Sequence, residues 1–239
     1  MSNKTTHKLR KITFTGIDKK TDVKELIDFT KAYPKTEFGF LAHVDQHSLG
    51  NRFCNPLILQ DCQGAGLSLS LHLCGKLAYN LLYSGDWSNV LTHMGDMFYM
   101  FDRIQLNVSG CPAGEKWMLT VPESVSEIII QQRNVDKMPA YRWYLKEKES
   151  VRGAFSVLLD TSGGRGQYSG IPRFADLPYA GYAGGFGPDN VSEIIQALEA
   201  STFIQNYWID METKVRDKRD WFSLELCREV CENSGVYAK

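Results

Sequence analysis

The chain has 239 residues, of which 43% are hydrophobic and 23% are charged, and its formal net charge is −1. This length is sufficient for one large domain or two small ones, and for a substantial buried core. Proteins that bind nucleic acid or an anionic membrane surface usually carry an excess of positive charge. This chain has no such excess, so we expect neither partner.

Nothing in the sequence indicates export or membrane insertion. The N-terminal segment MSNKTTHKLRK lacks the apolar core of a signal peptide, and no apolar run approaches the ~20 residues that a membrane-spanning helix needs. The six cysteines form no CxxC pair, and in a chain of this length they are typical of reduced thiols. We therefore expect a cytoplasmic protein with a single domain over residues 1–239, in which residues 1–11 form a flexible extension.

Short apolar runs rich in β-branched and aromatic residues recur along the chain at intervals typical of strand–helix units. In chain order, the predicted strands cover residues 12–17, 38–44, 67–73, 101–108, 126–133, 155–162, 179–185 and 206–212. The segments with helical features between and after them cover residues 21–33, 55–63, 76–87, 138–150, 188–200 and 219–233. Strands that alternate with helices indicate right-handed βαβ units and a parallel sheet.

Eight such units in a chain close to the roughly 250 residues typical of the fold predict an α/β protein, a single (β/α)8 TIM barrel. An open doubly wound sheet is the competing architecture, but it usually needs fewer strands. In a (β/α)8 barrel the active site lies at the C-terminal ends of the strands, so polar and glycine residues there are the candidate site residues. They include Thr15, His43, Asp45, His72, Asn107, Asp160, Gly184, Gly185, Glu212 and Thr213.

Asp160 is the most informative of these residues, because burying a carboxyl group in an apolar strand is costly unless the group is paired or used. The strand that carries it runs into a glycine-rich loop, VLLDTSGGRGQ at 157–167. The spacing from Gly164 to Gly170 is one residue longer than a dinucleotide-binding fingerprint, and no helix follows, so we expect no such cofactor. The glycines could direct backbone N–H groups toward an anion, or they could only form tight turns.

Six segments resemble consecutive blocks of the phosphoribosylanthranilate isomerases. They are FTGI at 14–17, FGFLAHVDQHSLGNR at 38–52, IQLN at 104–107, VLLDTSGGRGQ at 157–167, AGYAGGFGPDNV at 180–191 and WIDMETKVRDKRD at 208–220. Their order follows the family from the first strand to the last, so the resemblance covers most of the chain. It implies an Amadori rearrangement, in which a phosphorylated N-substituted aminoaldose becomes an aminoketose.

The resemblance also implies roles for individual residues. Asp160 matches the general acid that protonates the sugar ring oxygen, and burial favours the protonated form from which a carboxyl group donates. Arg52 matches the arginine that holds the substrate carboxylate, a role suited to a guanidinium group. The residues that match the ligand-binding blocks are Gln105 and Asn107, and those that match the phosphate cradle are Gly163, Gly164, Gly166, Gly184 and Gly185.

The chain departs from the family pattern in three of its blocks. Thr15 stands where the family has its general-base cysteine, and a threonine hydroxyl is too weak an acid to supply a base near neutral pH. Glu212-Thr213-Lys214 replaces the SSG phosphate element, and its carboxylate would repel phosphate unless Lys214 and Arg165 offset it. Asn107 replaces a histidine. We therefore expect an isomerase that acts on a phosphorylated small molecule. Its substrate should differ from that of the family, and it should need no cofactor.

Alternatives remain for the general base and for the function. His43, His72 and Asp45 are the candidate bases. The same three residues, in AHVD and SLHL, resemble the metal-binding pattern of ribulose-phosphate 3-epimerases and indicate a metal-assisted epimerase as an alternative, although Ala183 replaces an aspartate of that pattern. Hydrogen-bonded histidines without a metal are the favoured interpretation. A non-catalytic barrel that binds a phosphorylated ligand is the third function, and a homo-oligomer is compatible with each.

Overall fold

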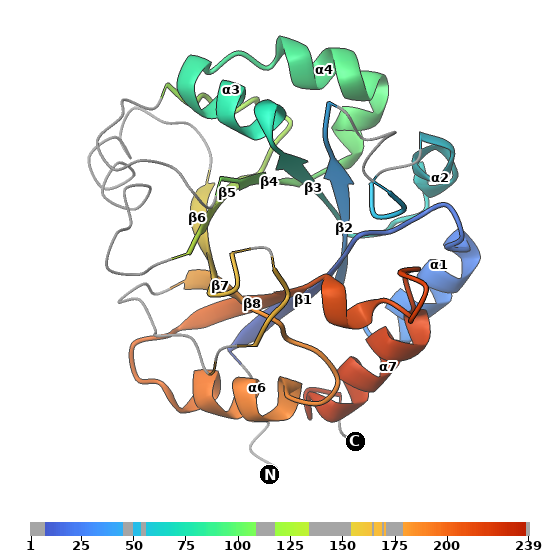
Figure 1. Cartoon of the computed structure of the whole chain (residues 1–239), viewed down its shortest axis with the longest axis vertical. Coiled ribbons are helices and arrows are strands. Elements are labelled where there is room, and N and C mark those ends of the chain that lie inside the picture. Colours follow the sequence, from blue (N-terminus) through green and yellow to red (C-terminus); the bar gives the residue numbers. More distant parts are fainter. Residues whose placement is uncertain are drawn as a thin grey trace.

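The computed structural model describes residues 8–44, 50–53, 56–108, 118–133, 154–163, 165–168, 170 and 179–237. Eight parallel strands pair in chain order and close into a barrel, which Figure 1 views from one end. The strands are β1 (Leu9–Thr15), β2 (Thr36–Ala42), β3 (Leu69–Cys74), β4 (Arg103–Asn107), β5 (Glu127–Gln132), β6 (Ala154–Asp160), β7 (Tyr179–Ala183) and β8 (Asn206–Met211). The predicted single (β/α)8 barrel is therefore confirmed.

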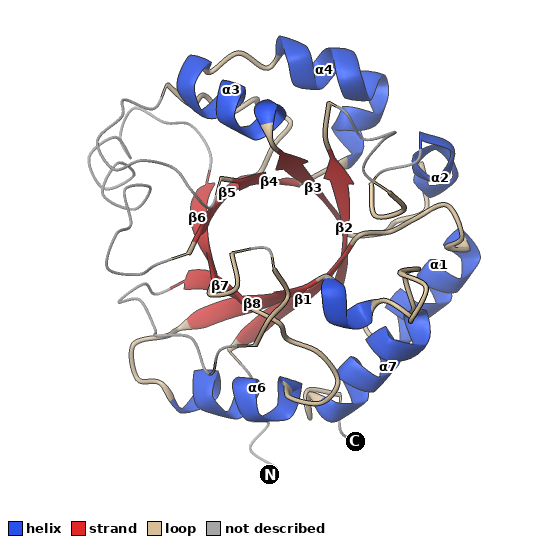
Figure 2. Cartoon of the chain, in the orientation of Figure 1, coloured by secondary structure: helices blue, strands red, loops and turns tan. Residues whose placement is uncertain are grey.

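The helices form a layer outside the barrel (Figure 2). They are α1 (Val23–Ala32), α2 (Pro56–Cys62), α3 (Lys76–Ser84), α4 (Ser88–Met94), α6 (Val191–Ala200) and α7 (Leu224–Asn233), with short 3₁₀ helices at Gly95–Met100 and Thr213–Val215. Side-chain caps set two of the starts: Asp22 accepts the N–H of Lys24, and Ser223 accepts the N–H of Leu226. Among the described residues, no helix combines the length and apolarity needed to span a membrane.

Two sequence-based expectations need correction. Residues 9–11 belong to β1 and not to a flexible extension, because Leu9 is fully buried and the Lys11 ammonium group donates to Glu37 at 2.8 Å. The predicted helix at 76–87 ends earlier, because Gly85 adopts a left-handed conformation (φ 69°) and its N–H bonds to the carbonyl of Leu81. The helix predicted at 138–150 lies outside the described residues.

The amino-terminal half of the barrel interior is filled by charged side chains, which we call the basal charge cluster: Lys11, Glu37, Arg103 and Glu127. The guanidinium group of Arg103 donates to Glu37 Oε1 at 2.6 Å and to Glu127 Oε2, and it lies 4.6 Å from the ring centroid of Trp208. Burial opposes ionisation of Glu37, but the charges of Arg103 and Lys11 lower its pKa below the usual value. The cluster closes this end of the barrel and leaves the opposite end for a ligand.

Gly181 on β7 allows Trp208 to lie across the barrel interior. A Cβ atom at position 181 would lie 2.2 Å from Cε2 of the indole ring, a distance that real side chains do not adopt. We expect Gly181→Ala to lower the free energy of unfolding by about 1–3 kcal/mol, as overpacking does, measured by urea denaturation. The same substitution in a Trp208→Phe background is the control, because the smaller ring removes the clash and the cost should shrink. Equal costs in both backgrounds would contradict this explanation.

Candidate active site

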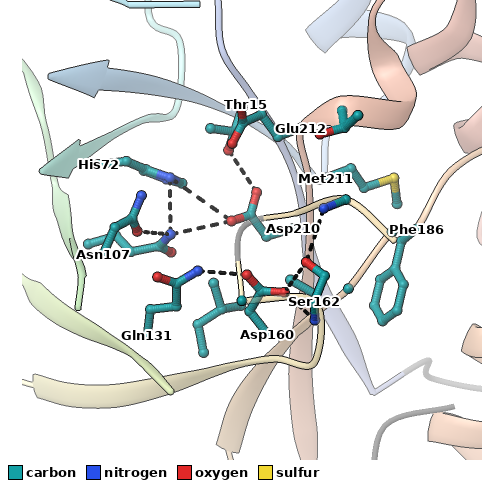
Figure 3. Close-up of a pocket in the computed structure, with 18 of the residues that line it drawn as sticks. Thr15, His72, Asn107, Gln131, Asp160, Ser162, Phe186, Asp210, Met211 and Glu212 are labelled. Atoms are coloured by element: carbon teal, nitrogen blue, oxygen red, sulfur yellow. Dashed lines mark hydrogen bonds and ion pairs between the residues drawn. The ribbon is translucent and has the colours of Figure 1, made fainter. Parts of the chain in front are cut away.

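A cavity of about 290 Å³ opens at the carboxyl ends of the strands, where the sequence placed the candidate site (Figure 3). Every strand supplies at least one lining residue, in order Thr15, Leu41, His72, Gln105, Gln131, Asp160, Ala183 and Asp210. The lining mixes apolar side chains with convergent polar groups, and its volume is near the lower limit for small-molecule sites. The barrel therefore assembles a ligand-sized site from segments that lie far apart in the chain.

The cavity brings together most of the predicted site residues. Those that line it are Thr15, His72, Gln105, Asn107, Asp160, Gly163, Gly166, Gly184, Gly185, Glu212, Thr213 and Lys214. Arg52 and His43 are not among the residues that line it, and Arg165 Nε donates to the carbonyl of Ser162 at 3.3 Å. Asp45 and Gly164 lie outside the described residues.

Asp160, at the end of β6, is buried and faces the cavity (Figure 3). Gln131 Nε2 donates to its Oδ2 at 2.7 Å, and both the N–H and the hydroxyl of Ser162 donate to its Oδ1, at 3.0 and 2.7 Å. Ser162 Oγ itself accepts the N–H of Gly166 at 3.2 Å, so the hydroxyl hydrogen is directed to Asp160. These donors suit an ionised carboxylate, which offers only acceptors.

Asp210, inside β8, is a second buried carboxyl group of the cavity, and the sequence analysis missed it. Thr15 Oγ1 donates to its Oδ1 at 2.7 Å, and Gln105 Nε2 lies 3.4 Å from its Oδ2. Burial raises the pKa of Asp210 to about 7, against the hydrogen bonds from Thr15 and Gln105, and the nearby charge of Asp160 adds to the rise. An acid within the apolar run YWIDM was the available signal, the same one that marked Asp160.

His72 is buried beside Asp210, with 4.0 Å between Nδ1 and Oδ2. Burial lowers the pKa of His72 to about 4, so the imidazole is neutral near pH 7 and is a weak base. Gln105 Nε2 lies 3.1 Å from Nδ1 and Ser70 Oγ lies 3.0 Å from Nε2. Because the amide nitrogen can only donate, we assign the ring proton to Nε2, and His72 positions Gln105 toward Asp210.

Cys74, at the end of β3, is the cysteine among the described residues that lines the cavity. Burial raises the pKa of its thiol to about 12, although Asn107 Nδ2 donates to its sulfur at 3.3 Å. A thiol with such a pKa remains protonated near neutral pH and is a poor base. Cys74 therefore does not replace the cysteine that the family carries at the position of Thr15.

His43 and His72 belong to the metal-binding pattern considered from the sequence, and the third residue of that pattern, Asp45, lies outside the described residues. The ring of His43 packs against Phe53, with 6.0 Å between centroids, and lies over Gly75, where a Cβ atom would come within 2.3 Å of Nε2. Within the part of the chain that the structure describes, no three His, Cys, Asp or Glu side chains form a group that could hold a metal ion. His43 therefore packs against Phe53 and Gly75 and is not among the residues that line the cavity.

The glycine residues of the β6 and β7 loops have distinct roles. Gly184 and Gly185 have φ of 136° and 73°, and a Cβ atom at 185 would lie 2.3 Å from the backbone nitrogen of Tyr168, so the two loops touch through glycine. The N–H groups of Gly163 and Gly166 are already donated, to Asp160 O at 3.1 Å and to Ser162 Oγ. The turn at Gly184 and Gly185 is therefore the better candidate for an anion cradle.

No family model matches the chain, and no curated protein sequence matches it. Solved structures, in contrast, do match the chain. Monomers generated from the dimeric phosphoribosylanthranilate isomerase of Thermotoga maritima are 13% identical, with coverage of 95% of this chain and 98% of that one and a TM-score of 0.55. The isomerase from Thermus thermophilus is 16% identical, with coverage of 93% and 97% and a TM-score of 0.54.

A third structure is a phosphoribosylanthranilate isomerase in complex with reduced 1-(o-carboxyphenylamino)-1-deoxyribulose 5-phosphate. It is 13% identical, with coverage of 94% of this chain and 97% of that one and a TM-score of 0.53. At sequence identities this low, structural similarity shows the fold of the chain and not its activity. The chain has a (β/α)8 barrel similar to that of the phosphoribosylanthranilate isomerases.

Proposed function

We propose that the protein is an isomerase that moves protons on a phosphorylated aminoaldose and converts it to the aminoketose. The observation that carries this proposal is the pair Asp160 and Asp210, two buried carboxyl groups from β6 and β8 that face one cavity (Figure 3). Two titratable groups whose surroundings hold them in different protonation states are the usual basis of acid and base roles.

The hydrogen bonds favour a particular division of these roles. Asp210, with its pKa raised by burial to about 7, keeps a proton in a large fraction of molecules at neutral pH and can protonate the sugar ring oxygen. The ring C–O bond then breaks and leaves an iminium group. Asp160, whose carboxyl oxygens accept from Gln131 and Ser162, takes the proton from C2, and the resulting enolamine relaxes to the ketone. This division reverses the acid role that the sequence resemblance implies for Asp160.

The phosphate end of the substrate is best placed at the turn formed by Gly184 and Gly185. Lys214 lies on the same side, since a Cβ atom at Gly187 would come within 2.5 Å of the Lys214 Cβ. Asn190 fixes this turn, because its side chain accepts the N–H of Gly187 at 2.9 Å and donates to the carbonyl of Gly185 at 3.1 Å. A fixed turn of glycine residues beside one cation suits a phosphate group.

The proposal is tested by proton transfer from C2, followed by proton NMR in D₂O with N-(5-phosphoribosyl)arylamines as substrates. We expect the wild-type protein to remove the C2 proton and to form the ketose with solvent deuterium at C1, and to leave the unphosphorylated ribosylamines unchanged. Asp160→Asn and Asp210→Asn should each lower the rate at least ~100-fold, as loss of a general acid or base does. The control Asp96→Asn, at an exposed position outside the barrel, should retain the wild-type rate.

Wild-type protein that binds these compounds without loss of the C2 proton would contradict the proposal and identify a non-catalytic binding barrel. No observation at the site favours the metal-assisted epimerase over the proposed isomerase.

A further inference from the structure

The guanidinium group of Arg52 is occupied by carboxylates of the protein itself. Its Nη1 donates to Glu212 Oε1 at 2.8 Å, and its Nη2 donates to Asp220 Oδ1 at 2.7 Å. Its Nε donates to the same Asp220 carboxylate at 3.0 Å, which completes a two-point contact. An arginine held in this way offers little to a carboxylate on a ligand.

A second arginine fixes this arrangement. Arg216 is buried and donates to Asp18 at 2.9 Å and to the carbonyl of Gly16 at 2.6 Å, so it joins the loops after β1 and β8. Its Nε also donates to Asp220 Oδ1 at 3.1 Å. Asp220 therefore bridges two arginines, and releasing Arg52 toward a ligand would break both its contact with Glu212 and its two-point contact with Asp220.

Charged side chains that a ligand would meet lie among the apolar residues of the cavity lining. At the β1 and β8 side, Glu212 lines the wall beside Thr15 (Figure 3), and its side chain is 31% exposed. Among the described residues that line the cavity, Lys214 is the one lysine or arginine, and it lies at the Gly187 side. Glu212 lines the same cavity, so a ligand that is bound at Lys214 and fills the cavity would meet Glu212.

We infer that the substrate, a phosphorylated aminoaldose under the proposed function, carries an amino group and not a carboxylate on its nitrogen substituent. An ammonium or amine donor at that end would pair with Glu212, whose second carboxylate oxygen is not the one bonded to Arg52. A carboxylate there would face Glu212 and find Arg52 already paired. Like charges across a closed site are a common means of excluding a wrong ligand.

Three matched compounds test this inference by calorimetric titration: reduced 1-(o-carboxyphenylamino)-1-deoxyribulose 5-phosphate, its unsubstituted phenyl counterpart and its o-(aminomethyl)phenyl counterpart. We expect the aminomethyl compound to bind at least ~10-fold more tightly than the carboxyl compound, with the phenyl compound between them, as for one ion pair gained or lost. Glu212→Gln should bring the three dissociation constants to within ~3-fold of one another. Glu225→Gln, at an exposed position on α7, should preserve the wild-type order.

The outcomes separate the two proposals. Tighter binding of the carboxyl compound, or an order that Glu212→Gln leaves unchanged, overturns the inference while phosphosugar binding stands. Failure of all three compounds to bind, together with retention of the C2 proton in the exchange test, overturns the proposed function and the inference with it.

Discussion

Replacement of Glu37 by Gln is expected to lower the free energy of unfolding by about 3–5 kcal/mol. Glu37 is fully buried in the basal charge cluster and accepts from Arg103, from Lys11 and from Thr13 Oγ1 at 2.9 Å. The neutral amide would leave the buried Arg103 with Glu127 as its remaining carboxylate. The cluster of Lys11, Arg103 and Glu127 would then carry a net positive charge, which is costly because water cannot fully solvate it inside the barrel.

Urea denaturation at pH 7 measures this loss, and Lys11→Met is its matched control. The Lys11 side chain is 31% exposed, so its ion pair with Glu37 is screened by solvent and its removal should cost no more than ~1 kcal/mol. A loss below 1 kcal/mol for Glu37→Gln would show that the cluster is not what closes the base of the barrel.

Asp210→Asn is expected to change the pH dependence of stability. The pKa of Asp210, raised by burial, is about 7 in the folded protein, whereas an aspartate in the unfolded chain has a pKa of about 3.9. The folded state therefore holds this proton more tightly, and the resulting stabilisation is complete below pH 4 and is lost as the pH rises through 7. Over that window the wild type should lose up to about 4 kcal/mol, from a shift of roughly three pKa units, that the asparagine variant does not lose.

The measurement is the difference in unfolding free energy between the variant and the wild type at pH 4, 6 and 8. As the pH rises, the unfolding free energy of the variant should increase relative to that of the wild type. The control Asp96→Asn should show a small and constant difference. A difference for Asp210→Asn that does not vary with pH would contradict the raised pKa and remove the basis for Asp210 as the proton donor at neutral pH.

The order and type of the strands were predictable from sequence, because each strand is a short apolar run bounded by loops and helices. Local apolar patterns predicted the end of a helix wrongly where two helices follow one another. Residues on both sides of Gly85 have helical spacing, and only the left-handed turn at that glycine separates α3 from α4. The helical spacing of apolar residues alone does not locate such a break between two helices.

Part of the site was also predictable. Asp160 stood out as an acid in an apolar strand, and the structure places it in the cavity. Asp210 carried the same signal in YWIDM, where alternation along β8 puts Trp208 and Asp210 on the interior face and Tyr207 and Ile209 among the core residues under the helices. Its place in the site depends on a hydrogen bond from Thr15, at the end of β1, which is 195 residues away in the sequence.

The eight-strand barrel, and the rim at which its polar strand ends meet, can be predicted because both follow from local apolar patterns and the parallel connections between them. Which charges pair cannot be predicted in this way. Arg52 meets Glu212 and Asp220, which are 160 and 168 residues away, and Arg103 meets Glu37 across 66 residues. Such pairs depend on the register at which the barrel closes, and no local pattern encodes that register.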